Sequence, residues 1–219
     1  MIKEKKYTKE ELLNILSTLD KEVSLTLGTA KEQGGYYQLI LVGGSVMLMS
    51  DLTERNTTKD IDTFGVPFPL IEIVSHYDLI NSASLVYEDY LPYNYEDRLV
   101  QLDIETEAII FARPSNEDLA VMKLYSNRTI DQDDLECEAF YNSLDWDLLD
   151  HLVYDEDEAI ASSLSPDYRY KFMVRTYENY AKKHGHVPNS TRVSEKISNI
   201  SYWEEYNQSH DSIGGSGAR

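Results

Sequence analysis

The chain has 219 residues, a length that suits one domain of ordinary size or a small catalytic domain with a helical appendage. Apolar residues make up 42% of the chain, which excludes global disorder, while 39 acidic against 20 basic residues give a net charge of −19. Such a chain repels nucleic acid and anionic membranes on average, so a nucleic-acid substrate would need a local basic patch. The single cysteine, Cys137, excludes an intramolecular disulfide and a cysteine-based zinc site.

The N-terminal part of the chain alternates helical and strand patterns. Thr8 to Glu11 forms a capping-box pattern, and leucine and isoleucine follow it at helical spacing. The predicted elements, in chain order, are a helix from Thr8 to Leu19, a helix over Val23–Glu32, a strand over Tyr36–Val42, a short helix over Val46–Met49, a strand over Lys59–Gly65 and a helix over Leu70–Ile80.

The C-terminal part begins with strands and continues as helices. The predicted elements are a strand over Arg98–Ile104, a strand over Ala108–Ala112, helices over Leu119–Tyr125 and Asp131–Tyr141, a helical pattern from Trp146 onward, an amphipathic helix over Tyr168–Lys183 and a shorter helix over Val193–Tyr206. This order predicts an α+β fold, with a small mixed β-sheet, flanking helices and a helical C-terminal half. We expect an α+β domain over residues 1–143, a helical region over 144–211 and a flexible tail over 212–219.

Two aspartates on the second predicted strand indicate a metal site. Asp60 and Asp62 are two residues apart, so on a strand they point to the same face, roughly 6–7 Å apart along the chain. Two carboxylates placed there repel each other unless a cation lies between them. Mg²⁺ suits such a pair because it takes oxygen ligands and leaves positions for phosphate oxygens. The glycine turn Gly43-Gly44-Ser45, which precedes a helix, offers backbone N–H groups to an anion.

The glycine turn, the loop and the Asp-Ile-Asp motif together resemble the signature of the DNA polymerase β-like nucleotidyltransferase superfamily. The longer motifs Val42-Gly43-Gly44-Ser45 and Thr58-Lys59-Asp60-Ile61-Asp62 resemble the minimal bacterial nucleotidyltransferases, which include the toxins of abortive-infection toxin–antitoxin systems. Fourteen residues separate Ser45 from Asp60, so the intervening loop is slightly extended for the superfamily. The resemblance implies that Asp60 and Asp62 bind Mg²⁺ or Mn²⁺, and that Gly43, Gly44 and Ser45 hold the phosphates of an NTP.

The resemblance also implies a third carboxylate on a neighbouring strand, which would complete a two-metal site and help to activate the acceptor. Asp103 is our choice, because it lies in the alternating segment Arg98–Ile104 on the expected face. Glu105 and Glu107 are the alternatives. The competing explanation is that Asp103 has no role in the site and is simply an exposed acid on an edge strand, which is common in so acidic a chain.

A second cluster follows the predicted sheet. Lys123 lies on a largely apolar helix, and Arg128, Asp131 and Asp134 come after it; this arrangement also resembles the abortive-infection group. A lysine in such surroundings needs an anionic partner, either a nucleotide phosphate or one of the carboxylates. Arg128 has the same two alternatives, and Asp131 and Asp134 are expected to cap and position the next helix.

The resemblance implies a metal-dependent nucleotidyltransferase that moves a nucleoside monophosphate from an NTP to a tRNA, a protein or a small molecule. Such proteins are often toxins or phage-defence components, so a cognate antitoxin or other protein partner is a further expectation. The sequence shows no signal peptide and no apolar run of membrane-spanning length, which favours a cytoplasmic protein. The alternative is a catalytically inactive relative with the same fold, acting as a binding or regulatory subunit, which gains weight if Asp103 does not meet Asp60 and Asp62.

Overall fold

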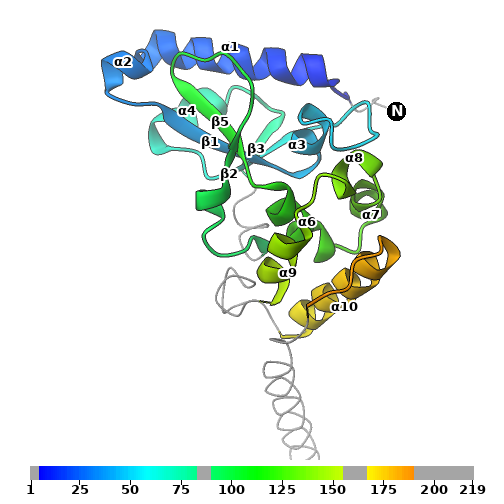
Figure 1. Cartoon of the computed structure of the whole chain (residues 1–219). Helices are drawn as coiled ribbons and strands as arrows, with labels where there is room; N and C mark the ends of the chain where they lie inside the picture. The colour runs from blue at the N-terminus through cyan, green and yellow to red at the C-terminus, as the bar shows by residue number, and fades with distance from the viewer. Residues whose placement is uncertain (1–4, 83–89, 155–166, 190–219) are drawn as a thin grey trace, which may run out of the picture.

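The structure is a computed structural model that describes residues 5–82, 90–154 and 167–189 (Figure 1). The predicted helix over Val193–Tyr206 and the predicted tail over 212–219 lie outside these residues. A mixed five-stranded sheet forms the centre of the N-terminal part, α1 (Lys9–Leu27) lies along one side of it, and the later helices gather beyond its other side. The expected α+β class, with helices in the C-terminal half, is confirmed.

Helix α1 begins at a complete capping box. The Thr8 hydroxyl accepts a hydrogen bond from the Glu11 backbone N–H at 3.3 Å, and the Glu11 carboxylate accepts one from the Thr8 N–H at 2.8 Å. The predicted helix over Val23–Glu32 is wrong, because Val23 continues α1 and only the four-residue α2 (Ala30–Gln33) follows. No helix-breaking residue stands between Leu19 and Val23, and the first one, Gly28, ends α1 with a φ of 100°.

The sheet has the strand order β3-β2-β1-β5-β4. Its strands are β1 (Tyr37–Val42), β2 (Ile61–Phe64), β3 (Ile80–Ser82), β4 (Val100–Gln101) and β5 (Ile109–Arg113). Strand β1 is central and its last four residues are buried, as expected for a strand covered on both faces. It pairs with β2 antiparallel, which sets Val42 opposite Asp62, and with β5 parallel, which sets Ile40 opposite Ala112.

Two predicted elements around this sheet are wrong. The predicted helix over Leu70–Ile80 is a 3₁₀ turn η1 (Phe68–Leu70), a short helix α4 (Ile71–Val74) and then strand β3. Strand β3 pairs with β2 and so provides hydrogen-bond partners for the backbone along that side of β2. The predicted strand over Arg98–Ile104 shrinks to the two residues of β4. Arg98, the first residue of the predicted strand, instead ends the 3₁₀ turn η3 (Tyr95–Arg98). Its guanidinium pairs with the fully buried Asp118, with Nη2 2.8 Å from Oδ1.

The helices after the sheet pack on one continuous hydrophobic core with it. They are α6 (Asn116–Leu124), α7 (Thr129–Leu135), α8 (Glu138–Tyr141), α9 (Trp146–Tyr154) and α10 (Asp167–Lys183). The single helix predicted over Asp131–Tyr141 is divided at Cys137. Leu135 and Phe140 are both buried, and because five residues of a continuous helix would turn them to different faces, the break lets both reach the core. The predicted amphipathic helix over Tyr168–Lys183 is confirmed as α10.

No helix among the described residues is both long enough and apolar enough to cross a membrane.

Candidate active site

The glycine turn lies where β1 gives way to α3 (Gly43–Met49), and both glycines have a charged side chain close to the backbone. Gly43 has a φ of +75°, and a Cβ atom on it would lie 2.8 Å from Oδ2 of Asp62. A Cβ atom on Gly44 would lie 2.5 Å from Nη1 of Arg55. The turn therefore allows an acid from β2 and a base from the following loop to approach the backbone closely. The Ser45 hydroxyl is buried and donates to the Val42 carbonyl at 3.3 Å, so it faces back toward β1.

Asp60 and Asp62 lie beside this turn. Ile61 and Thr63 alternate with them and are fully buried, so the expected assignment of faces on this strand is confirmed, although β2 begins only at Ile61. Burial first, and the neighbouring Asp60 second, raise the pKa of the Asp62 carboxyl, against a hydrogen bond from Asn81 and the charge of Arg128. Asp60 and Asp62 thus form a like-charged pair with oxygen donors that suit a hard divalent cation.

Asp103 does not join this pair. It is exposed and lies on a bend after β4. Extending the register from the pairs Gln101–Ala112 and Gln38–Ile110 sets Asp103 level with Gln38, whereas Asp62 is level with Val42. Asp103 is therefore displaced from Asp62 by four residues along the strands and by three strand spacings across the sheet, and each displacement is about 13–14 Å. Within residues 5–82, 90–154 and 167–189, no group of three or more His, Cys, Asp or Glu side chains could hold a metal ion.

The two alternatives to Asp103 lie still further along the same direction. Glu105 is exposed, and Glu107 accepts a hydrogen bond from the Ser24 hydroxyl of α1 at 3.0 Å. The Glu107 backbone N–H donates to Asp20, also on α1, at 2.8 Å. This end of the sheet is thus tied to the first helix.

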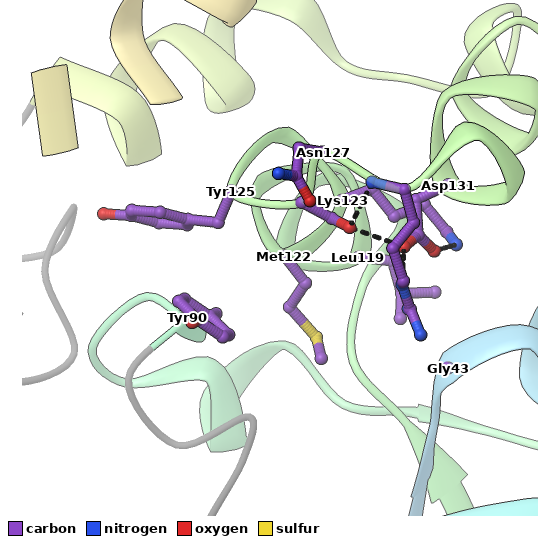
Figure 2. A pocket seen from close by; sticks show the side chains of 10 residues that line it. Gly43, Tyr90, Leu119, Met122, Lys123, Tyr125, Asn127 and Asp131 are labelled. Carbon is purple, nitrogen blue, oxygen red and sulfur yellow. Dashed lines mark hydrogen bonds and ion pairs between the residues drawn. The ribbon is translucent and has the colours of Figure 1, made fainter. Parts of the chain in front are cut away.

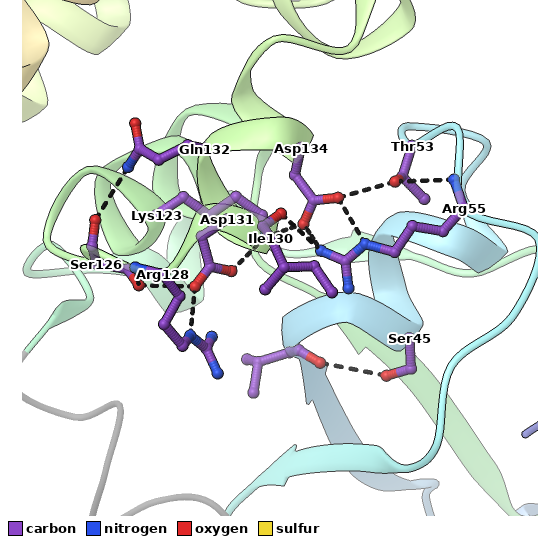
Figure 3. Close-up of polar contacts among 11 residues, drawn as sticks. Ser45, Thr53, Arg55, Lys123, Ser126, Arg128, Ile130, Asp131, Gln132 and Asp134 are labelled. Atoms are coloured by element: carbon purple, nitrogen blue, oxygen red, sulfur yellow. Dashed lines mark hydrogen bonds and ion pairs between the residues drawn. The ribbon is translucent and has the colours of Figure 1, made fainter. Parts of the chain in front are cut away.

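The second predicted cluster is a buried ion network between α6 and α7 (Figure 3). Nζ of Lys123 lies 3.2 Å from Oδ1 of Asp131 and 2.5 Å from Oδ2 of Asp134, and the lysine is only 4% exposed. The anionic partner of Lys123 could have been a nucleotide phosphate or a carboxylate. In the structure its partners are two carboxylates, and they belong to α7 and not to the sheet. The expectation that Asp131 and Asp134 cap the next helix is wrong, because both lie within α7 and no side-chain cap is present at the start of α7 or of α8. Their carboxylates instead connect α7 to α6 through Lys123.

Asp131 and Arg128 connect the ion network to the surface. Nε of Arg128 lies 2.6 Å from Oδ2 of Asp131, and the Ser126 hydroxyl donates to the same oxygen at 2.7 Å. Burial acts to raise the pKa of Asp131, but Lys123, Ser126 and Arg128 together hold that pKa below its ordinary value. The Arg128 side chain is 58% exposed, and its charge also acts on Asp62.

Arg55 is a residue of this site that the sequence did not indicate. Its Nε donates to Oδ1 of Asp134 at 2.9 Å, and its Nη2 pairs with Oδ2 of Asp134 (Figure 3). Its Nη1 approaches Gly44. The Thr53 hydroxyl also donates to Asp134, at 2.8 Å. These contacts join the loop after α3 to α7. A lone arginine in a polar loop carries no sequence signal for a partner 79 residues away.

Of the cavities that open beside these groups, two reach the glycine turn. We call the first the metal-side cavity; it has a volume of about 350 Å³, and Asp60, Asp62, Gly44, Arg55, Lys59 and Arg128 are among its lining residues. Four cations line it, because Lys6 joins Arg55, Lys59 and Arg128, against the three acids Asp60, Asp62 and Asp131. In a chain with a net charge of −19, this local balance favours a polyanion at this point of the surface.

We call the second cavity the tyrosine cavity. It has a volume of about 290 Å³, and its lining includes Tyr90, Leu119, Met122, Tyr125 and Asn127 (Figure 2). Arg128 and Asp131 line both cavities. The two cavities therefore adjoin at this ion pair.

A family model described as a nucleotidyltransferase of unknown function, DUF6036, matches residues 14–184. The matched range contains the glycine turn, both aspartates and the ion network. No curated protein and no solved structure matches the chain. Because the match covers most of the 219 residues, the chain belongs to the DUF6036 family of nucleotidyltransferases.

Proposed function

We propose that this protein binds an NTP together with Mg²⁺ or Mn²⁺ at Asp60 and Asp62 and transfers the nucleoside monophosphate to an acceptor hydroxyl. The observation that carries the proposal is the like-charged aspartate pair in a cavity that four lysine and arginine side chains also line. A cation held by the pair and a triphosphate held by the basic side chains would neutralise each other's charge. The cation would also relieve the repulsion between the two aspartates, which contributes to the raised pKa of Asp62.

The side chains around the cavity have separate parts in this proposal. Asp60 and Asp62 would hold the metal ion, whose chemistry is to neutralise charge on the phosphate oxygens. Lys59 and Arg128 line the cavity and would contact the triphosphate. Lys123 is a positioning residue, because its ammonium is engaged by Asp131 and Asp134 and so fixes the turn that carries Arg128. Gly43 and Gly44 leave the room that the phosphates and Arg55 need.

The transfer step exchanges one phosphorus–oxygen bond for another. The acceptor oxygen forms a bond to the α-phosphorus, the bond from that phosphorus to the oxygen bridging to the β-phosphate breaks, and pyrophosphate leaves with the electron pair. The acceptor hydroxyl loses its proton to water. Arg128, at the border of the cavities, is the cation best placed to stabilise charge on the α-phosphate.

A second function, nucleotide binding without transfer, is favoured by one specific observation. Asp103, Glu105 and Glu107 lie at the far end of the sheet, and among the described residues no third carboxylate is grouped with Asp60 and Asp62 so as to share a metal ion. Asp131 lines the same cavity, but it is paired with Lys123 and Arg128. A pair of carboxylates suffices for a nucleotide-bound metal ion, whereas the two-metal mechanism uses more ligands. A binding or regulatory subunit would bind a nucleotide with its metal ion but would lack the ligands for two-metal transfer.

The acceptor and the biological role are also part of the proposal. A tRNA, a protein or a small molecule remains the acceptor class, and the strongly acidic chain favours the latter two over bulk nucleic acid. A toxin or phage-defence role and a cognate antitoxin rest on the resemblance of the glycine turn and the Asp-Ile-Asp motif to the abortive-infection group.

The test has a binding arm and a transfer arm. We would titrate each of the four NTPs with and without Mg²⁺ or Mn²⁺ by calorimetry, and follow label from α-³²P-NTP into total tRNA, total lysate protein or the protein itself. Metal-dependent binding that Asp62→Asn abolishes and Asp103→Asn leaves unchanged supports the metal site. Transfer with pyrophosphate release supports the enzyme, and binding without transfer supports the regulatory subunit. If no NTP binds with either metal, the proposal is wrong.

A further inference from the structure

We propose that the tyrosine cavity is the pocket for the nucleoside of the NTP, with Tyr90 as the face on which the base stacks and Asn127 as the group that reads its edge. The inference rests on the proposed function, since it assumes that the triphosphate occupies the metal-side cavity. Nothing in the family description assigns a role to this cavity.

The chemistry of the lining matches a nucleobase. The Tyr90 and Tyr125 rings lie with their centroids 5.2 Å apart at an interplanar angle of 34°, and Leu119 and Met122 complete an apolar wall (Figure 2). Aromatic rings and a thioether offer a base a polarisable surface on which it can stack. The Asn127 side chain, which is on the turn after α6, has both donors and an acceptor for a base edge.

The position of the tyrosine cavity matches the shape of an NTP. Gly43 lines this cavity and Gly44 lines the metal-side cavity, so the two lie on either side of one turn. Arg128 and Asp131 are common to both linings. A single NTP therefore extends from Tyr90 to the aspartate pair and passes Arg128 at its α-phosphate, where the nucleoside meets the phosphates.

The tyrosine cavity has fewer charged lining residues than the metal-side cavity, and for this reason we assign the nucleoside to the tyrosine cavity. The metal-side cavity is lined by seven charged side chains: Lys6, Arg55, Lys59, Arg128, Asp60, Asp62 and Asp131. The tyrosine cavity is lined by only three charged side chains, Lys123, Arg128 and Asp131, and the last two also line the metal-side cavity. Its volume of about 290 Å³ is close to the lower limit of small-molecule pockets, which is about 300 Å³, and suits one base.

The experiment compares two probes that differ only in the nucleoside. Inorganic tripolyphosphate with Mg²⁺ occupies the metal-side cavity alone, whereas an NTP with Mg²⁺ occupies both. Because loss of one stacked base costs roughly 5- to 150-fold in affinity, wild-type protein should bind at least one NTP more tightly than tripolyphosphate by a factor in that range. Tyr90→Ala should reduce this preference at least about fivefold and leave the tripolyphosphate affinity unchanged.

Three variants make the comparison specific. Tyr90→Phe keeps the ring and should keep the preference. Tyr93→Ala removes a half-exposed tyrosine that does not line the cavity and should have no effect. Asn127→Ala should change the ranking of the four NTPs more than their mean affinity. If Tyr90→Ala does not fold, as judged by its thermal transition, Tyr90→Leu retains the bulk and tests the loss of the ring alone.

The outcomes separate this inference from the proposed function. Equal affinity of wild-type protein for tripolyphosphate and for every NTP would overturn the nucleoside pocket and leave the metal site standing. The same is true if Tyr90→Ala or Tyr90→Leu weakens both probes equally. Failure of wild-type protein to bind either probe with Mg²⁺ would overturn both proposals together.

Discussion

A methyl group on Gly43 would lie 2.8 Å from Oδ2 of Asp62, closer than real carbon–oxygen contacts of this kind. The backbone at the end of β1 and the carboxylate on β2 therefore touch, although 18 residues of sequence separate them. The close approach places Asp62 against the glycine turn and leaves its raised-pKa carboxyl beside Asp60.

Gly43→Ala should consequently destabilise the protein and disrupt the site. The φ of +75° alone costs an alanine about 1–2 kcal/mol, and the contact with Asp62 adds to that cost. Gly65→Ala is the matched control, because Gly65 has a φ of +70° and nothing within 4 Å of its added Cβ atom. Urea unfolding should show the larger loss for Gly43→Ala, and only Gly43→Ala should lose metal-dependent NTP binding. Equal effects of the two variants would argue against the contact.

Asp62→Asn should stabilise the metal-free protein at neutral pH. The folded-state pKa of Asp62 is raised above its ordinary value of 3.8, so the stability that this carboxyl contributes is complete below 3.8 and is lost as pH rises through the folded pKa. Asparagine removes this loss. We expect a melting temperature higher by about 2–4 °C at pH 7, which is on the order of 1 kcal/mol for a chain of this size, and no gain below pH 3.8.

Thermal unfolding at several pH values without divalent metal measures this effect. Asp103→Asn, which changes an exposed acid, should follow the wild-type curve at every pH. A lower melting temperature for Asp62→Asn across the whole range would mean that the lost hydrogen bond to Asn81 outweighs the relieved repulsion.

The local sequence pattern was enough to predict the parts of the fold and of the site that depend on neighbouring residues. The alternation through Ile61 and Asp62, the capping box at Thr8 and the amphipathic pattern of α10 each involve contacts within one element or one turn. The glycine turn and the aspartate pair lie on adjacent antiparallel strands, so one pairing sufficed to bring them together.

The rest of the site depends on long-range pairings that a local pattern does not encode. The alternating segment around Asp103 has the period of a strand, yet its place in the sheet depends on its partner, β5, which puts it at the edge furthest from β3. Arg55 has its partner, Asp134, on a helix far along the chain. The position of Asp103 and the role of Arg55 could therefore not be read from the sequence.

Lys123→Met should destabilise the protein strongly. It leaves the buried carboxylates of Asp131 and Asp134 with one cation fewer, and breaking a buried ion pair on one side costs about 3–5 kcal/mol. The double variant Lys123→Met/Asp131→Asn should recover part of the loss, because it removes the charge that lost its partner. Urea unfolding of both variants and of Asp131→Asn completes a double-mutant cycle. Additive losses would mean that Lys123 and Asp131 do not interact.

Asp20→Ala should destabilise the protein without touching the candidate site. Asp20 is only 2% exposed, and its carboxylate accepts hydrogen bonds from the backbone N–H groups of Glu107, Ala108 and Ile109 at 2.8, 2.9 and 2.8 Å. Alanine would leave buried N–H groups at the start of β5 without a partner. The cost is about 2–4 kcal/mol, since each buried donor left unsatisfied costs about 1–3 kcal/mol and water reaches part of this end.

The measurement pairs urea unfolding with NTP titration below the unfolding transition. Lys21→Ala changes the exposed neighbour on the same helix and controls for helix propensity, so its stability should stay within about 0.5 kcal/mol of wild type. Because Asp20 binds the end of β5 opposite to Arg113 and α6, the NTP affinity of folded Asp20→Ala protein should equal that of wild type. A large loss of affinity in the folded variant would mean that the start of β5 and the metal-side cavity are coupled through the sheet.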